Sequence, residues 1–199
     1  MFDIGWNLAL IPLVVGYLLG SIPFGLLLTR LMGAGDLRGI GSGNIGATNV
    51  LRTGRKGLAA ATLLLDMAKG VAAVMIGQRY GSDYAVIGGM AAFVGHVYPV
   101  WLKFSGGKGV ATMLGVTLAL NWALGLVFAI VWLLALAATR ISSVSGMAAA
   151  ISVPIAASLM GKMGLGYALL ILAMIVIWKH RANIGRLIDG TEPKVGQAR

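Results

Sequence analysis

The chain has 199 residues, of which 58% are hydrophobic and only 11% charged, and it contains 30 glycines. This composition is typical of a polytopic membrane protein and argues against a soluble domain with a polar surface. The chain has no cysteine, which excludes disulfide bonds and thiolate chemistry, and its two histidines and six acidic residues are too scattered for a metal cage. The net charge of +10 fits cytoplasmic loops and affinity for phosphates or anionic membrane lipid better than it fits nucleic-acid binding.

Six apolar stretches follow one another along the chain. The first, residues 7 to 29, carries no charge and is long enough to span a bilayer as a helix. No cleavage site follows it, so we expect a retained span rather than a signal peptide. The stretch 109 to 139 would form a helix of about 46 Å, which is too long for one crossing, and Asn121 offers a place to turn. The other stretches cover residues 57 to 78, 84 to 102, 141 to 161 and 163 to 178.

The distribution of lysine and arginine supports a division at Asn121. With seven segments and the N-terminus outside, thirteen cations lie inside and two, Arg79 and Lys162, lie outside; six segments give eight against seven. Positive residues concentrate in cytoplasmic loops, so seven segments are favoured. We therefore expect one all-α polytopic membrane domain over residues 1 to 199, with about seven transmembrane or partly spanning helices and a cytoplasmic C-terminus. The chain has no matched halves, which does not support a two-repeat transporter.

The segment GIGSGNIGATNVLR, residues 39 to 52, is the first candidate for phosphate binding. Its Gly-x-Gly-x-x-Gly spacing does not indicate a dinucleotide site, because an apolar span rather than a strand precedes it. Glycines can turn backbone N–H groups toward an oxyanion, and arginine binds phosphate with two hydrogen bonds. A flexible connector is the alternative. The candidate binding residues are Ser42, Gly43, Asn44, Thr48, Asn49 and Arg52.

A second glycine-rich segment, Gly106-Gly107-Lys108-Gly109, leads directly into an apolar run. Free N–H groups at a helix N-terminus beside a lysine favour an anion. The full nucleotide-binding pattern is absent, which argues against ATP hydrolysis. The alternative is a simple helix start with a lysine at the membrane edge. The candidates here are Gly106, Gly107, Lys108 and Thr112.

Polar residues near the other expected cytoplasmic ends complete the candidate set. His180 and Asn183 would share a helix face if the last span continues, although a basic membrane anchor is the alternative. Arg140, Ser142 and the single glutamate, Glu192, are further candidates, though anchoring or pairing would also explain them.

Three further residues are expected inside the spans. Asp66 and Lys69, three apart on one helix, are expected to neutralise each other within the membrane and to support the site. His96 is expected either as a buried, satisfied histidine or as a phosphate ligand or proton carrier.

Three segments together resemble those of one family. GSGNIGATNVLR (41 to 52), GHVYPVWLKFSGGKGVAT (95 to 112) and HRANIGRLIDGTE (180 to 192) are similar to the signatures of the membrane glycerol-3-phosphate acyltransferases that use acyl phosphate, the PlsY family, and SIPFG and LLDMAKG fit its pattern as well. The resemblance covers nearly the whole chain. It implies a multi-pass protein of the bacterial inner membrane whose active site faces the cytoplasm.

The resemblance also implies the chemistry. An acyl group passes from acyl phosphate to position 1 of glycerol 3-phosphate, giving lysophosphatidic acid and phosphate, in phospholipid synthesis. The mixed anhydride is already activated, so no cofactor or metal is expected. His180, Asn183, Lys108 and Ser142 are expected to be catalytic; the glycine-rich candidates, His96, Arg140 and Glu192 are expected to bind or support substrate. Either His180 or a phosphate oxygen of the donor is the base, and the sequence assigns neither phosphate to a loop nor an oligomeric state.

Two functions from other classes remain open. An anion carrier would also suit glycines and arginines beside broken helices. A lipid-binding scaffold with a basic face would show neither acyltransfer nor transport. The polar residues confined to one expected face favour the enzyme.

Overall fold

A computed structural model describes residues 5 to 196 of the chain, and these residues form helices and no strand. The expected all-α fold is therefore confirmed. Contacts divide the chain between Leu120 and Asn121 into two compact units, which we call unit 1 and unit 2. The single domain expected from the sequence stays a prediction.

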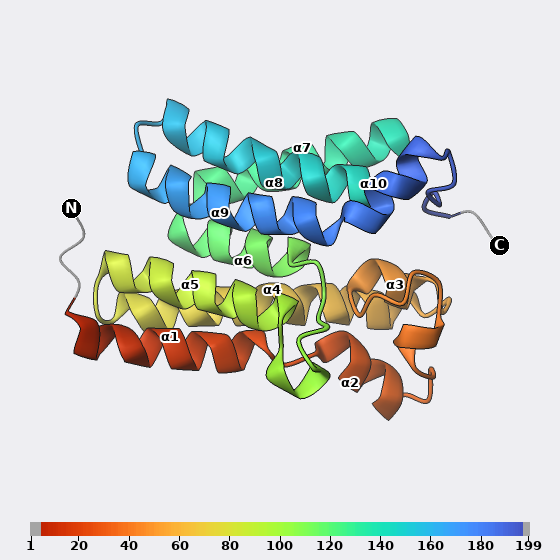
Figure 1. Cartoon of the computed structure of the whole chain (residues 1–199), viewed down its shortest axis with the longest axis horizontal. Coiled ribbons are helices and arrows are strands. Elements are labelled where there is room, and N and C mark those ends of the chain that lie inside the picture. The colour runs from red at the N-terminus through yellow and green to blue at the C-terminus, as the bar shows by residue number, and fades with distance from the viewer. Residues whose placement is uncertain (1–4, 197–199) are drawn as a thin grey trace. The chain divides into compact units, whose positions relative to one another are not determined.

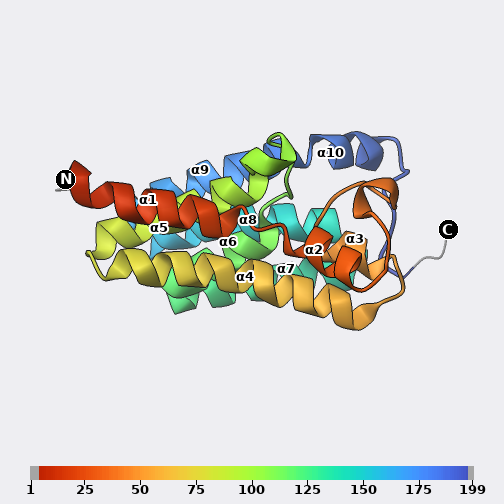
Figure 2. The ribbon, with the colours of Figure 1, turned by 90° about the horizontal axis from the view of Figure 1, so that it is seen from below.

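The described part of unit 1 contains four longer helices and four short helical pieces. The helix α4 packs against α1, α5 and α6, and α1 also runs beside α5 (Figure 1). The short α2 and α3 lie at the end of α4 where that helix begins (Figure 2). The elements are α1 (Trp6–Gly20), α2 (Phe24–Leu31), η1 (Leu37–Gly39), α3 (Ala47–Leu51), α4 (Lys56–Gln78), α5 (Ser82–Val97), η2 (Val100–Leu102) and α6 (Val110–Leu120).

Glycines at the helix crossings bring the backbones of unit 1 close together. A Cβ atom on Gly20 of α1 would collide with the Ala92 carbonyl group of α5. On Gly115 of α6 it would collide with the Met67 carbonyl group of α4. Small residues at such contacts are how helices associate in a membrane, where water does not drive apolar surfaces together. The glycine content of the chain thus serves packing as well as loops.

The first apolar stretch is not one continuous helix. It forms one candidate membrane span over Asn7–Leu31, as expected, but its helical structure stops at Gly20 and resumes at Phe24. Pro23 occupies the N-cap position of α2, where the missing N–H group of proline costs no helical hydrogen bond. The break sets the direction in which α2, and the glycine-rich segment that follows it, leave α1.

Unit 2 consists of α7 (Trp122–Thr139), α8 (Ser142–Leu159), α9 (Met163–Lys179) and α10 (Arg181–Ile188). The expected turn at Asn121 is confirmed: Asn121 is extended and its Oδ1 accepts the Leu124 N–H at 3.2 Å, which caps α7. The chain bends by 55° between α9 and α10. One expectation required His180 and Asn183 to lie on one continuous helix, and because of this bend they do not.

Five of the described helical segments are long and apolar enough to cross a membrane, and six if α9 and α10 count as one bent span. The helix α6 has 11 residues, or about 16 Å, and crosses only part of the bilayer, as the division at Asn121 predicts. The polytopic membrane fold is thus confirmed. The orientation of the termini stays a prediction.

Candidate active site

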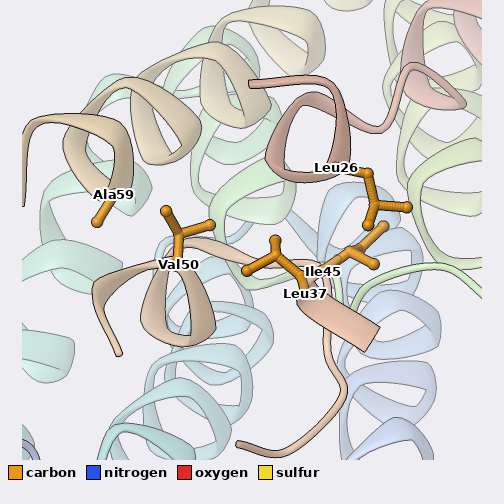
Figure 3. Packing of buried hydrophobic residues seen from close by; sticks show 5 residues of the cluster. All are labelled: Leu26, Leu37, Ile45, Val50 and Ala59. Atoms are coloured by element: carbon orange, nitrogen blue, oxygen red, sulfur yellow. The ribbon is translucent and has the colours of Figure 1, made fainter. Parts of the chain in front are cut away.

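A small hydrophobic cluster fixes the first glycine-rich segment to α2 and α4. Figure 3 shows its side chains, which come from α2, η1, α3, α4 and the extended residues before α3. A Cβ atom on Gly25 would collide with the carbonyl oxygen of Ile45, so α2 also touches the segment through its backbone. The segment is therefore packed against α2 and α4. The cluster comprises Leu26, Leu37, Ile45, Val50 and Ala59.

Asn49 is the hydrogen-bonding centre of this segment and is only 1% exposed. Its Nδ2 donates to the carbonyl oxygens of Leu37 at 3.0 Å and Ile40 at 2.9 Å, and its Oδ1 accepts the backbone N–H of Ser42 at 3.2 Å. These bonds hold the turn that carries Ser42. Asn49 thus positions the loop, and its direct contact with substrate stays a prediction.

Arg52 and Ser42 lie on the exposed side of Asn49. Arg52 Nη1 donates to Asn49 Oδ1 at 3.4 Å and lies against Gly41, whose φ is +55°. Gly43 also has a positive φ, +68°, and closes the turn with an N–H bond to Ile40. A guanidinium beside a hydroxyl can bind an oxyanion, and phosphate binding at this end of the segment stays a prediction. Asn44 and Thr48 are half-buried on the same segment.

Asp36, which was not among the candidate site residues, forms ion pairs with Arg38 and Arg30. Arg38 Nε donates to both oxygens of Asp36 at 3.0 and 3.1 Å, and Arg30 lies 3.6 Å from Asp36. The hydrogen bonds from Arg38 hold the pKa of Asp36 well below its ordinary value. Part of the positive charge near the segment is thereby neutralised.

The second glycine-rich segment is tied to the end of α5. The N–H of Gly106 donates to the Val97 carbonyl at 3.2 Å, and that of Gly107 to the His96 carbonyl at 3.0 Å. The expectation of free N–H groups is therefore wrong for both glycines. The N–H groups in the first turn of a helix have no intrahelical acceptor. The backbone donors that could still bind an anion here are therefore those in the first turn of α6.

Lys108 and Thr112 lie where that segment enters α6. Lys108 is half-buried, and Gly109 beside it has a φ of +85° and packs on the Phe93 ring. Thr112 is completely buried, and its Oγ1 has no hydrogen-bond partner among the described residues. Substrate contacts of these side chains stay predictions.

Asp66, Lys69 and His96 form a buried polar cluster in unit 1. Lys69 Nζ lies 2.7 Å from Asp66 Oδ1, which confirms the expected pair. His96 Nδ1 lies 3.5 Å from the same oxygen, and all three side chains are at most 5% exposed. His96 is thus buried beside a carboxylate, and its role as a phosphate ligand or proton carrier stays a prediction.

In unit 2, Glu192 binds the tail of the chain to α8 and α10. Its carboxylate accepts hydrogen bonds from Ser143 Oγ at 2.7 Å, Asn183 Nδ2 at 2.5 Å and Arg186 Nε at 2.7 Å. Burial acts to raise the pKa of Glu192, but the three donors outweigh it and the pKa lies below its ordinary value. The alternative expectation that Glu192 takes part in pairing is therefore borne out, with Arg186 as the partner; Ser143 and Arg186 were not among the candidate site residues. The three-residue spacing of Asn183 and Arg186 on one helix was the available signal.

His180 lies at the bend between α9 and α10 and is 3% exposed. Its Nδ1 lies 2.8 Å from the Val176 carbonyl oxygen. A carbonyl only accepts, so Nδ1 carries a hydrogen and donates it to Val176. The role of His180 as a base stays a prediction.

Arg140 and Ser142 flank the junction of α7 and α8. Arg140 has a φ of +59°, accepts the Val195 N–H at 2.7 Å on its carbonyl oxygen and donates from Nη2 to the Val195 carbonyl at 3.3 Å. Arg140 therefore holds the tail, as Glu192 does. Ser142 is the first residue of α8 and is half-buried. Among the described residues no group of three or more acidic or histidine side chains could hold a metal ion.

Sequence comparison places these residues in a known context. The family model described as glycerol-3-phosphate acyltransferase matches residues 10 to 190. The chain is 58% identical to a glycerol-3-phosphate acyltransferase of Brucella anthropi, with 92% of each chain covered. It is 57% identical to that of Mesorhizobium japonicum, covering 94% of this chain and 96% of the relative.

Solved structures agree with the sequence relatives. The chain is similar to a crystal structure of PlsY, an integral membrane glycerol 3-phosphate acyltransferase, in its glycerol 3-phosphate form, with a TM-score of 0.90, 38% identity and coverage of 94% and 96%. The lysophosphatidic acid form of PlsY gives a TM-score of 0.88 at 36% identity, with coverage of 94% and 95%. The family match over most of the chain and the shared fold lead to one conclusion: the chain belongs to the glycerol-3-phosphate acyltransferase family of integral membrane proteins.

Proposed function

We propose that the protein transfers a fatty acyl group from acyl phosphate to the 1-hydroxyl of glycerol 3-phosphate, giving lysophosphatidic acid and inorganic phosphate. Family membership supports the acceptor. The phosphate-binding chemistry of the two glycine-rich segments supports a donor that also carries a phosphate. The proposed location is the bacterial inner membrane, with the reacting groups on the cytoplasmic side, where membrane lipid surrounds the acyl chain.

The reaction needs one bond to form and one to break. The hydroxyl oxygen of glycerol 3-phosphate attacks the acyl carbonyl carbon, an ester C–O bond forms, and the C–O bond to phosphate breaks with its electron pair on the leaving phosphate. The hydroxyl proton passes to a base. Because the donor is an activated mixed anhydride, the protein's contribution is orientation and charge stabilisation.

The observation that carries the proposal is the pairing of cations with glycine-rich turns. Arg52 and Ser42 share a packed turn around Asn49, and Lys108 stands at the start of α6. Cations and helix N-termini stabilise phosphate oxygens. Asn183, Ser142 and His180 of unit 2 are proposed to orient glycerol 3-phosphate, with Glu192 and Arg140 holding the segment that carries Asn183.

Two bases are compatible with the residues. His180 can accept the proton at Nε2, or an oxygen of the donor phosphate can accept it. We expect His180→Gln to lower kcat and remove an ionisation from the pH profile if His180 is the base. A wild-type rate and pH profile for this variant would leave the donor phosphate as the base.

The proposal is tested on purified protein in detergent with palmitoyl phosphate as donor. We expect phosphate release that requires glycerol 3-phosphate and matches lysophosphatidic acid formation, with no product from palmitoyl-CoA. Product from palmitoyl-CoA alone would contradict the acyl-phosphate donor. Transport of labelled glycerol 3-phosphate into liposomes without lipid product would favour a carrier.

A pair of lysine variants tests the second segment. We expect Lys108→Ala to lower kcat/KM by about 100-fold, the scale seen when a charge-stabilising donor is removed. Lys162→Ala, at an exposed lysine in the turn between α8 and α9, is the matched control and should keep the wild-type value. Equal effects of the two substitutions would remove Lys108 from the proposed mechanism.

A further inference from the structure

Two charged residues lie near the middle of a membrane-spanning helix. Asp66 lies about 15 Å along the axis of α4 from the first residue of that helix, and Lys69 lies about one turn further on. Charges at such depth are expensive, and those that occur are usually paired or functional. Paired charges alone would not explain this position, because apolar side chains of the same size would fill it as well.

The cluster reaches the second glycine-rich segment through His96. The Nδ1 of His96 faces Asp66 Oδ1 at 3.5 Å. At the other side of the ring, a Cβ atom on Gly107 would collide with His96 Nε2. The backbone carbonyl of His96 also accepts the Gly107 N–H at 3.0 Å. The His96 ring thus lies between Asp66 and the Gly107 backbone, so a change in the position of the ring would displace Gly107.

The cluster reaches the first glycine-rich segment through Lys69. Lys69 Nζ donates to the Ile22 carbonyl at 2.8 Å, inside the break between α1 and α2, and lies 5.7 Å from the centroid of the Phe24 ring. This fixes the start of α2, which carries Leu26 into the hydrophobic cluster beneath the first segment.

The same break also contacts the loop after α5. Trp101 Nε1 donates to the Ser21 carbonyl at 2.7 Å. The break between α1 and α2 is thus held from α4 and from the loop that precedes Gly106. Both glycine-rich segments are connected to one buried network.

We propose that Asp66, Lys69 and His96 are positioning residues for acyl transfer, which set the geometry of both glycine-rich segments of unit 1. This inference rests on the proposed function of those segments in holding substrate phosphate. The three side chains act through backbone positions, those of Gly107 and Ile22, and are not themselves proposed to touch the substrates.

The test separates positioning from stability by removing both charges together. The double substitution Asp66→Leu with Lys69→Met leaves no unpaired charge, so we expect it to fold with a melting temperature close to that of the wild type. We expect its kcat/KM to fall by about 10- to 100-fold, because displacement of a binding group by about 1 Å has effects of this size. The control is Arg79→Gln at the exposed far end of α4, about 20 Å from Asp66.

Binding of inorganic phosphate gives a readout that does not depend on turnover. Phosphate that binds the folded protein raises its melting temperature. We expect about 10-fold more phosphate to be needed for the same rise in the double variant, and no change in the Arg79→Gln control. A double variant with wild-type kcat/KM and wild-type phosphate response would overturn the inference.

Variants of His96 keep the inference testable should the double variant fail to fold. Asparagine retains a donor near the Nδ1 position, so we expect His96→Asn to recover part of the phosphate response that His96→Ala loses. A folded His96→Ala protein with the wild-type phosphate response would overturn the role of His96. If the wild type binds phosphate in a cluster-dependent way but makes no lysophosphatidic acid, the proposed function fails, while the role of the cluster in setting the geometry of the phosphate-binding segments stands.

Discussion

Glu192 shows how one carboxylate can hold three polar groups of unit 2 in fixed positions. Its side chain is 5% exposed and accepts hydrogen bonds from Ser143, Asn183 and Arg186. Asn183 is one of the residues proposed to orient glycerol 3-phosphate. The carboxylate therefore controls the direction in which the Asn183 amide points.

Removing the carboxylate should reduce both stability and activity. We expect Glu192→Ala to lower the free energy of unfolding by about 2–3 kcal/mol, because it leaves three donors without their shared acceptor. Glu192→Gln should lose less, since its amide oxygen still accepts. Thermal unfolding in detergent measures the first effect and the KM for glycerol 3-phosphate the second. Equal melting temperatures for the alanine variant and the wild type would contradict this role.

The lowered pKa of Glu192 also predicts an acid dependence of stability. Since the folded protein holds the carboxylate more strongly than the unfolded chain does, the stabilisation is complete above the ordinary pKa of about 4.5. It is lost as the pH falls below that value through the folded pKa. We expect Glu192→Gln to lack this component of the pH dependence, as measured by melting temperatures between pH 7 and pH 3. Parallel curves for the two proteins would contradict it.

At the scale of single residues, sequence reasoning found residue types better than it found their partners. Asn49 and Arg140 were both named as substrate ligands. In the structure, Asn49 donates hydrogen bonds to carbonyl groups of its own segment, and Arg140 donates one to Val195, 55 residues away. Such partners depend on how the chain folds back, which the local pattern does not contain.

Among the elements, the crossing of α4 and α6 depends on close backbone contact. A Cβ atom on Gly115 would collide with the Met67 carbonyl, and backbone cannot move aside as a flexible side chain can. We expect Gly115→Ala to lower the free energy of unfolding by about 1–3 kcal/mol through overpacking. Gly57→Ala is the control, since no atom lies within 4 Å of its Cβ position and alanine favours the helix. Thermal unfolding of the two variants measures the difference. A Gly115→Ala protein as stable as the wild type would contradict the packing argument.

The elements themselves were largely predictable from length and hydropathy. The 31-residue apolar stretch required a turn, and Asn121 was the one polar residue placed to make it. The break before Phe24 was missed because Ser21, Ile22 and Pro23 do not interrupt the apolar run, and proline is also acceptable in the first turn of a helix. The bend at His180 was missed because no glycine or proline marks it.

At the scale of the whole molecule, the orientation in the membrane follows from the charge count and can be tested directly. The chain has no cysteine, so one introduced cysteine is the only thiol. We expect Ser105→Cys to react with a membrane-impermeant maleimide in inside-out vesicles, and Ser82→Cys to react in right-side-out vesicles. Both serines are exposed at the ends of apolar segments. The reverse pattern would place the N-terminus in the cytoplasm.

The two hydrogen bonds that join Gly106 and Gly107 to the end of α5 have a consequence for how this chain can vary in length. They close residues 98 to 105 into a lobe whose two ends are fixed to each other by the backbone. Lys103, Phe104 and Ser105 are exposed within that lobe. Lengthening a loop between fixed ends costs little, only about 0.6 kcal/mol for each doubling. Because Trp101 of the same lobe donates to the Ser21 carbonyl, only residues inserted after Lys103 should leave that bond and Lys108 in place, and a short peptide tag there should leave the acyltransferase active.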